Sequence, residues 1–142
     1  QTELRDTIGR IETDIPTFDQ LGRNIPLLGY TFKEVLRLYP PVPNLIRRTI
    51  KPCEIGGYEV PAHTMVGTSI SANHHLPEYW HEPFKFDPMR FSESRAEHKQ
   101  HKFLWAPFGG GGHKCIGLHF ADMLFKSVLP KDNLPLLLIS ER

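Results

Sequence analysis

The sequence predicts a mainly α-helical fold with a small antiparallel β-sheet, which is an α+β class. Two segments, 26–39 and 115–129, repeat apolar side chains with the 3.6-residue period of an amphipathic helix. Between them, residues 44–69 contain short β-type runs, and a Gly-Gly pair lies where a hairpin turn is expected. These patterns define the fold class.

The first firm helix is expected from Pro26 to Tyr39. Proline suits the first helical turn, and the pair Pro40-Pro41 ends the helix because proline cannot continue it. Its apolar stripe consists of Leu28, Phe32, Val35, Leu36 and Tyr39. Upstream, residues 1–10 predict the end of a helix stopped near Gly9, and residues 11–25 predict a polar loop with a helical turn at 18–21.

The β-type runs cover residues 45–50, 53–55, 58–60 and 65–68, with Gly56-Gly57 as the turn of a hairpin. A short helix is expected at 71–75. Residues 77–113 then predict an ordered loop, and a loop of this length is more often functional than not. A last helix is expected from Cys115 to Leu129, stopped by Pro130.

The composition excludes several function classes. With 142 residues and 17 Lys+Arg against 16 Asp+Glu, the chain fits one domain or part of a larger one, and non-specific nucleic-acid binding has no support. Two cysteines exclude a disulfide framework and an all-cysteine metal site. No apolar run is long enough to span a bilayer. Because the chain begins with Gln1, a fragment is expected, and both a cytoplasmic location and attachment through a missing N-terminus stay open.

The segment FGGGGHKCIG, residues 108–117, is the most informative. Its four consecutive glycines let the backbone approach a flat ligand closely. With Cys115 expected at a helix start, the helix dipole favours a thiolate, which serves as a nucleophile or a metal ligand. The alternative is a buried structural cysteine beside a flexible turn.

Two further elements gain meaning from their order. Glu34-x-x-Arg37 taken alone predicts a surface ion pair, and Pro88-x-Arg90-Phe91 taken alone predicts a proline turn with an exposed arginine. Here they precede the Cys115 loop in that order. The combination closely resembles the C-terminal part of a cytochrome P450, a haem-thiolate monooxygenase. The family pattern Phe-x-x-Gly-x-x-x-Cys-x-Gly is matched at every fixed position, and the segment ANHHLPEYWHEPFKFDPMRF is similar to the family's meander.

The resemblance covers residues 1–129, a partial P450 domain, and leaves 130–142 as an atypical tail. It implies that the Cys115 thiolate ligates the iron of haem b. Glu34, Arg37 and Arg90 match the family's structural charged triad. The resemblance also implies further cofactor-binding positions. Arg47, with Arg48 as a weaker alternate, and His113 would bind the haem propionates. Phe108 would lie beside the sulfur, and Gly109, Gly111 and Gly117 would lie against the ring.

The parent enzyme implied by the resemblance inserts one atom of O₂ into an apolar substrate, with electrons from a reductase or a ferredoxin-type protein. Asn44, Leu45 and Ile46 match a stretch that borders the substrate pocket. The basic segment 98–102 and Lys114 form either a docking face for an acidic partner or a solvated loop. His74, His75 and His81 are expected to be solvated loop residues. His63 stands where the family usually has glycine.

The resemblance implies that the chain is much shorter than a full family member, and we expect it to lack the central helix that relays protons to bound oxygen. We therefore expect the isolated chain to be inactive and marginally stable. Two alternatives stay open. One is a cysteine-nucleophile hydrolase built on Cys115 and a histidine base. The other is a non-catalytic truncated remnant.

Overall fold

The computed structural model describes residues 25–128, and the statements below concern these residues. The helices are α3 (Pro26–Leu38), α4 (Ile70–Asn73) and α5 (Leu118–Val128), and the strands are β1 (Asn44–Arg48), β2 (Cys53–Ile55), β3 (Tyr58–Val60) and β4 (Met65–Ser69). Three 3₁₀ turns follow α4, namely η1 (Pro88–Phe91), η2 (Glu97–Lys99) and η3 (Gly111–His113). The predicted α+β class is confirmed. The elements expected at 1–10, 18–21 and 130–142 lie outside the described residues.

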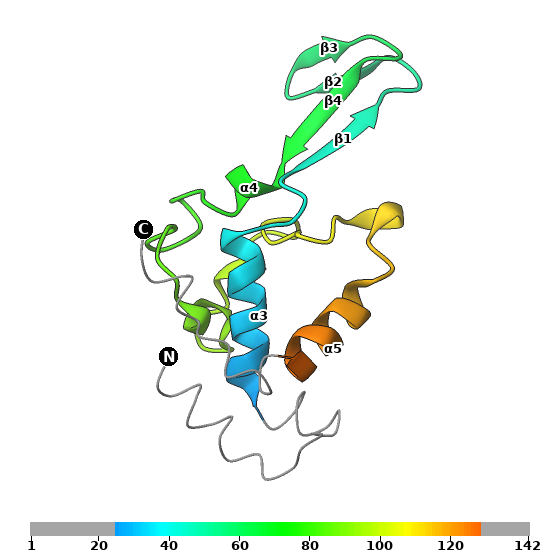
Figure 1. The fold of residues 1–142 in the computed structure, drawn as a ribbon. Helices are drawn as coiled ribbons and strands as arrows, with labels where there is room; N and C mark the ends of the chain where they lie inside the picture. Colours follow the sequence, from blue (N-terminus) through cyan, green and yellow to red (C-terminus); the bar gives the residue numbers. More distant parts are fainter. Residues whose placement is uncertain (1–24, 129–142) are drawn as a thin grey trace.

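The β region forms two separate antiparallel ladders and not the single sheet that the sequence predicts. Strand β1 pairs with β4, and β2 pairs with β3. Pro52 precedes β2 and Pro61 follows β3. Because proline has no N–H group to donate, these residues interrupt pairing between the two ladders. Figure 1 shows both ladders extending away from the helices at one end of the molecule.

The predicted hairpin turn is confirmed. Ile55 pairs with Tyr58, and the two residues between them, Gly56 and Gly57, have φ values of 59° and 84°. Positive φ at both central positions is the geometry of the tight turn that matches strand twist, and glycine adopts it without a Cβ clash.

Helix α3 lies at the centre of the fold, beside α5 and the turn η1 (Figure 1). Its buried face carries Leu28, Thr31, Phe32, Glu34 and Arg37. This face therefore buries a carboxylate and a guanidinium among its apolar residues. Both charged groups need partners inside the protein, because burying an unpaired charge costs several kcal/mol.

Apolar packing is divided between two small clusters. Trp80, Phe91 and Leu104 form the first, with Tyr30 and Trp105 packed against it. Ile25 and Leu28 form the second, with Phe125 of α5 packed against it. The ring of Phe32 lies 5.0 Å from that of Phe125 and 6.2 Å from that of Phe108. These aromatic contacts fix α5 and the start of the glycine loop against α3.

The last helix begins later than the sequence predicts. Lys114, which follows the η3 turn, has an extended backbone with ψ of 141°, and the first α5 bond runs from the Ala121 N–H to the Gly117 carbonyl. The expectation that Cys115 stands at the start of a helix is therefore wrong. Cys115 lies three residues before α5, beyond the first-turn N–H groups of that helix.

Candidate functional site

Glu34 is the centre of a fully buried ion network. Its carboxylate accepts two hydrogen bonds from Arg37, from Nε at 2.7 Å and from Nη2 at 2.9 Å. The same carboxylate accepts a bond of 3.1 Å from Arg90 Nε and one of 2.9 Å from the Asp87 N–H. All three charged side chains are 0% exposed. The geometry is a carboxylate between two arginine forks, which is the strong form of charged hydrogen bonding.

The two guanidinium groups also bind backbone carbonyls of the loop after α4. Arg37 donates to the carbonyls of His74 (2.8 Å), Pro83 (2.6 Å) and Lys85 (3.3 Å). Arg90 donates to those of His81 (2.8 Å) and Lys85 (3.1 Å). These carbonyls lie in irregular chain and have no helix or sheet ladder to satisfy them. The arginines therefore hold residues 74–85 in place as well as pairing with Glu34.

A fourth member of this network, Glu97, was missed at the sequence level. Its Oε2 accepts a bond of 2.8 Å from Arg90 Nη1, and Oε1 accepts from Arg95. Burial acts to raise the pKa of Glu97, but hydrogen bonds from Arg95 and Arg90 outweigh it, and the pKa lies below its usual value. Glu97 lies in a polar segment without periodicity, so no sequence signal distinguished it from the neighbouring loop residues.

His74 is fully buried, which corrects the expectation of a solvated loop histidine. Its Nε2 accepts a hydrogen bond of 3.1 Å from the Ala106 N–H, and its Nδ1 lies 3.1 Å from the Arg37 carbonyl oxygen. Because Nε2 accepts, the proton must be on Nδ1, which donates to Arg37. Burial lowers the pKa of His74 to about 4. The neutral ring thus ties the end of α3 to the segment that leads into the glycine loop.

The loop around Cys115 is exposed. The Cys115 thiol is free, and the Cys115 N–H donates to the Phe108 carbonyl at 2.9 Å, which closes the loop on itself. Gly109 and Gly111 have φ values of 70° and 66°, a region that favours glycine. A Cβ at Gly110 would lie 2.7 Å from the Phe103 ring. The backbone therefore favours glycine at 109 and 111, and a side chain at 110 would require the Phe103 ring to move.

A hollow of ≈ 320 Å³ lies between this loop and the strands. The residues that line it include Leu45 and Arg47 of β1, Phe103, and Gly109–Gly111. Arg47 is exposed, and the one hydrogen bond that its side chain makes to a described residue is to the neighbouring Ile46 carbonyl. The structure thus brings Arg47 and the glycine loop around one cavity, although they are far apart in the sequence.

Cys115 and the remaining predicted cofactor-binding residues lie in or beside this loop and do not line the hollow. Phe108 packs against Phe32 and Trp105 on the α3 side. His113 is exposed in η3. Gly117 is half-buried, and a Cβ there would lie 3.7 Å from Cys115 Sγ.

Comparison with known proteins decides the family. The family model of cytochrome P450 matches residues 1–131. The chain belongs to the cytochrome P450 family. It is 42% identical over 116 residues to cytochrome P450 136 of Mycobacterium tuberculosis, covering 82% of this chain and 23% of that protein.

Other P450 relatives are named for different activities. A sterol 14alpha-demethylase of Mycolicibacterium vanbaalenii is 38% identical over 106 residues, which are 75% of this chain and 24% of the relative. The thromboxane-A synthase of Mus musculus is 34% identical over 111 residues, which are 78% of this chain and 21% of the relative. The chain therefore spans about a quarter of the length of the P450 relatives it matches.

P450 membership makes this chain part of a monooxygenase family and implies a haem-thiolate cofactor. Members generally use redox partners and apolar substrates. Within residues 25–128, no helix is both long and apolar enough to cross a membrane.

The described residues fit a haem-thiolate group. The fit rests on the chemistry of the donors, since Cys115 offers a free exposed thiol and Arg47 offers a guanidinium at a cavity edge. Gly109–Gly111 line the hollow and carry no side chains, so a flat ring can approach the backbone there.

Proposed function

We propose that this chain is the haem-ligand part of a cytochrome P450 monooxygenase and that it binds haem b through the Cys115 thiolate. The observation that supports this most is the free, exposed Cys115 in a glycine loop whose flanks are anchored to a buried charged framework. A thiolate ligand donates electron density to haem iron and so favours O–O bond cleavage. In this proposal residues 1–129 are the P450 part and 130–142 an atypical tail.

Each loop residue has a defined role in the proposal. Cys115 supplies the axial thiolate, and Phe108 packs beside the sulfur. Gly109, Gly111 and Gly117 allow the ring to approach the backbone. Arg47 and His113, both exposed, bind the propionates through charge-assisted hydrogen bonds.

The network of Glu34, Arg37 and Arg90 contributes to haem retention and not to chemistry on substrate. It holds the chain between α4 and η1, and His74 extends this hold to Ala106, two residues before Phe108. A loop fixed in this way presents its thiolate with little loss of conformational entropy on binding.

The whole protein, on this proposal, inserts one atom of O₂ into an apolar organic substrate. Electrons come from a reductase or ferredoxin-type partner, and the exposed basic residues Lys99, Lys102 and Lys114 supply a face for an acidic partner. Asn44, Leu45 and Ile46 border the substrate. Leu45 lines the hollow beside the glycine loop, which supports this placement.

The chain offers a matched pair of cysteines for the test, because Cys53 and Cys115 are both free and exposed. The chain is loaded with haem, reduced and exposed to carbon monoxide. We expect a thiolate-type Soret band in the parent chain and in Cys53→Ser, and its loss in Cys115→Ser. A thiolate band that persists in Cys115→Ser, or no haem uptake by the parent chain, would contradict the proposal.

The cysteine-hydrolase alternative finds no support. Among residues 25–128, no histidine nitrogen is hydrogen-bonded to Cys115 Sγ. A hydrolase needs such a base close to its nucleophile. Assay of the same two serine variants with an activated ester separates the classes, and we expect no turnover that depends on Cys115.

A further inference from the structure

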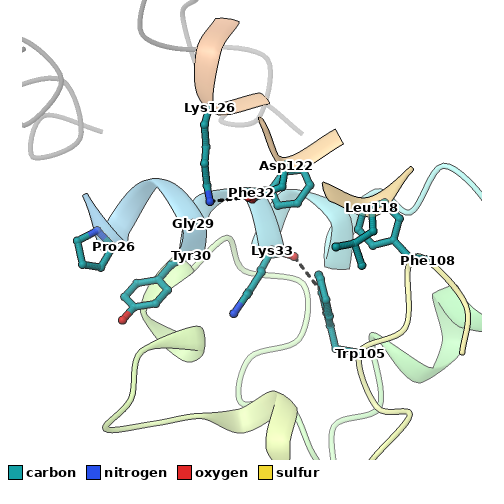
Figure 2. Close-up of a pocket in the computed structure, with 10 residues that line it drawn as sticks. All are labelled: Pro26, Gly29, Tyr30, Phe32, Lys33, Trp105, Phe108, Leu118, Asp122 and Lys126. Atoms are coloured by element: carbon teal, nitrogen blue, oxygen red, sulfur yellow. Dashed lines mark hydrogen bonds and ion pairs between the residues drawn. The ribbon is translucent and has the colours of Figure 1, made fainter. Parts of the chain in front are cut away.

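A second hollow lies between α3 and α5, and it shares no lining residue with the hollow beside Arg47. Its volume is ≈ 400 Å³. Figure 2 shows that α3 contributes Tyr30, Phe32 and Lys33, that α5 contributes Leu118, Asp122 and Lys126, and that Trp105 and Phe108 close the third side. Four of the lining side chains are aromatic. The walls therefore suit a flat apolar ring.

Charge in this hollow is unevenly compensated. Lys126 Nζ is 2.7 Å from Asp122 Oδ2, so that pair is satisfied. Lys33 is half-buried, and the structure gives its ammonium no carboxylate partner within residues 25–128, only the Phe91 ring with its centroid at 5.9 Å. Burial, and then the charges of Lys99 and Lys126, lower the pKa of Lys33, and the opposing effect of the Asp122 carboxylate is smaller. An anion beside Lys33 would remove this imbalance.

We propose that the hollow between α3 and α5 binds a small aromatic molecule with one carboxylate, its ring among Tyr30, Trp105 and Phe108 and its carboxylate on Lys33. The ring would contact Phe108 and Leu118, which stand on the two sides of the glycine loop. Such a ligand would contact both flanks of the Cys115 loop without entering the hollow beside Arg47, with which this site shares no lining residue. The site goes beyond the proposed function and does not depend on haem.

The two tryptophans supply the readout. The Trp105 indole N–H donates to the Lys33 carbonyl at 3.1 Å and lies at the hollow, whereas the Trp80 indole N–H donates to Asn73 and does not. Both indole N–H signals are followed by NMR in the full haem-free chain. The signal that disappears in Trp105→Phe is assigned to Trp105. We expect 2-naphthoate to shift the Trp105 signal alone, with a dissociation constant on the order of 1 mM or tighter. The neutral 2-naphthamide is expected to bind about fivefold more weakly.

Three variants test the role of charge. Lys33→Gln is expected to weaken 2-naphthoate binding about fivefold, and Lys51→Gln, an exposed residue away from the hollow, to leave it unchanged. Asp122→Asn frees Lys126 and removes a repelling carboxylate, so it is expected to tighten binding. A gain of affinity cannot come from a failure to fold.

Three results would overturn the proposal. One is equal binding of the amide and the carboxylate, and another is weaker binding in Asp122→Asn. The third is an unshifted Trp105 signal, which would mean that 2-naphthoate does not bind in the hollow. Because haem is absent throughout, failure here leaves the Cys115 experiment unaffected.

Discussion

Arg37 and His74 bind each other through reciprocal hydrogen bonds between side chain and backbone. The Arg37 guanidinium donates to the His74 carbonyl at 2.8 Å, and the His74 ring donates from Nδ1 to the Arg37 carbonyl at 3.1 Å. The ring then accepts from Ala106 on its other side. Helix α3, the segment after α4 and the approach to the glycine loop therefore meet at one residue pair.

His74 makes the stability of the chain sensitive to acid. The folded state lowers its pKa to about 4 from an ordinary value near 6.5, so between these values the unfolded chain binds a proton that the folded chain does not. Stability therefore falls as the pH falls through this window. We expect the shifted pKa of His74 to lower the unfolding free energy of the chain by about 2 kcal/mol between pH 7 and pH 5. Urea denaturation at the two pH values measures this difference.

His98 requires a separate control, because burial lowers its pKa to about 4 as well. His98→Gln should remove its own contribution and leave that of His74. In His74→Gln the unfolding free energy should be lower at pH 7 and flatter with pH. An unchanged slope in His74→Gln would contradict the assignment.

The buried Glu34 should contribute far more to stability than Glu82, a paired glutamate on the surface. Glu34→Gln leaves the buried Arg37 without a carboxylate partner, whereas Arg90 keeps Glu97. Breaking a buried ion pair in this way typically costs about 3–5 kcal/mol, so we expect a loss of about 3 kcal/mol or more. Glu82→Gln is the matched control, since Glu82 pairs with Lys85 at 2.9 Å but its side chain is 54% exposed. Urea melts should show a large shift for the first variant and none for the second. Similar melts for both would contradict this account.

A side chain at Gly110 should force the Phe103 ring to move. A Cβ at position 110 would lie 2.7 Å from the Phe103 ring, whereas at Gly112 it would meet nothing within 4 Å. We expect Gly110→Ala to weaken haem uptake by about tenfold, the effect of a 1.4 kcal/mol strain, and Gly112→Ala to have little effect. The measurement is the haem titration of each variant.

A second substitution tests whether Phe103 is the cause. Truncating the ring in Gly110→Ala/Phe103→Ala should recover part of the lost affinity relative to Phe103→Ala alone. If the two changes were simply additive, contact between residues 110 and 103 would not explain the effect.

His63 should be replaceable by glycine with a gain in stability. Its φ is 63°, in the left-handed region where a side chain costs about 1 kcal/mol. Its N–H donates to the Thr49 carbonyl and its carbonyl accepts from Arg48, and both bonds survive the change. We expect His63→Gly to raise the unfolding free energy by up to about 1 kcal/mol and His63→Ala not to raise it. Thermal denaturation of both variants tests this. A gain in His63→Gly alone indicates backbone strain, and a gain in both variants indicates a side-chain effect.

The sequence alone determined the fold class, the position of α3, the Gly56-Gly57 turn and the family. These features rest on local patterns: apolar period, proline stops, a glycine pair, and fixed motif spacing. The same patterns placed the start of the last helix wrongly. Local patterns do not predict that Gly111–His113 forms a separate 3₁₀ turn or that Lys114 has an extended backbone.

Only the tertiary structure decided which charged and polar groups are buried together. Glu34 and Arg37 are three residues apart on one helix, so their pairing could be expected, but the contacts of Glu97 with Arg90 and of His74 with Ala106 depend on how the irregular chain folds back. Loop conformation is set by which backbone carbonyls and N–H groups find partners across the fold. That matching has no sequence period, and it also determines that Arg47 and Gly109–Gly111 line one hollow.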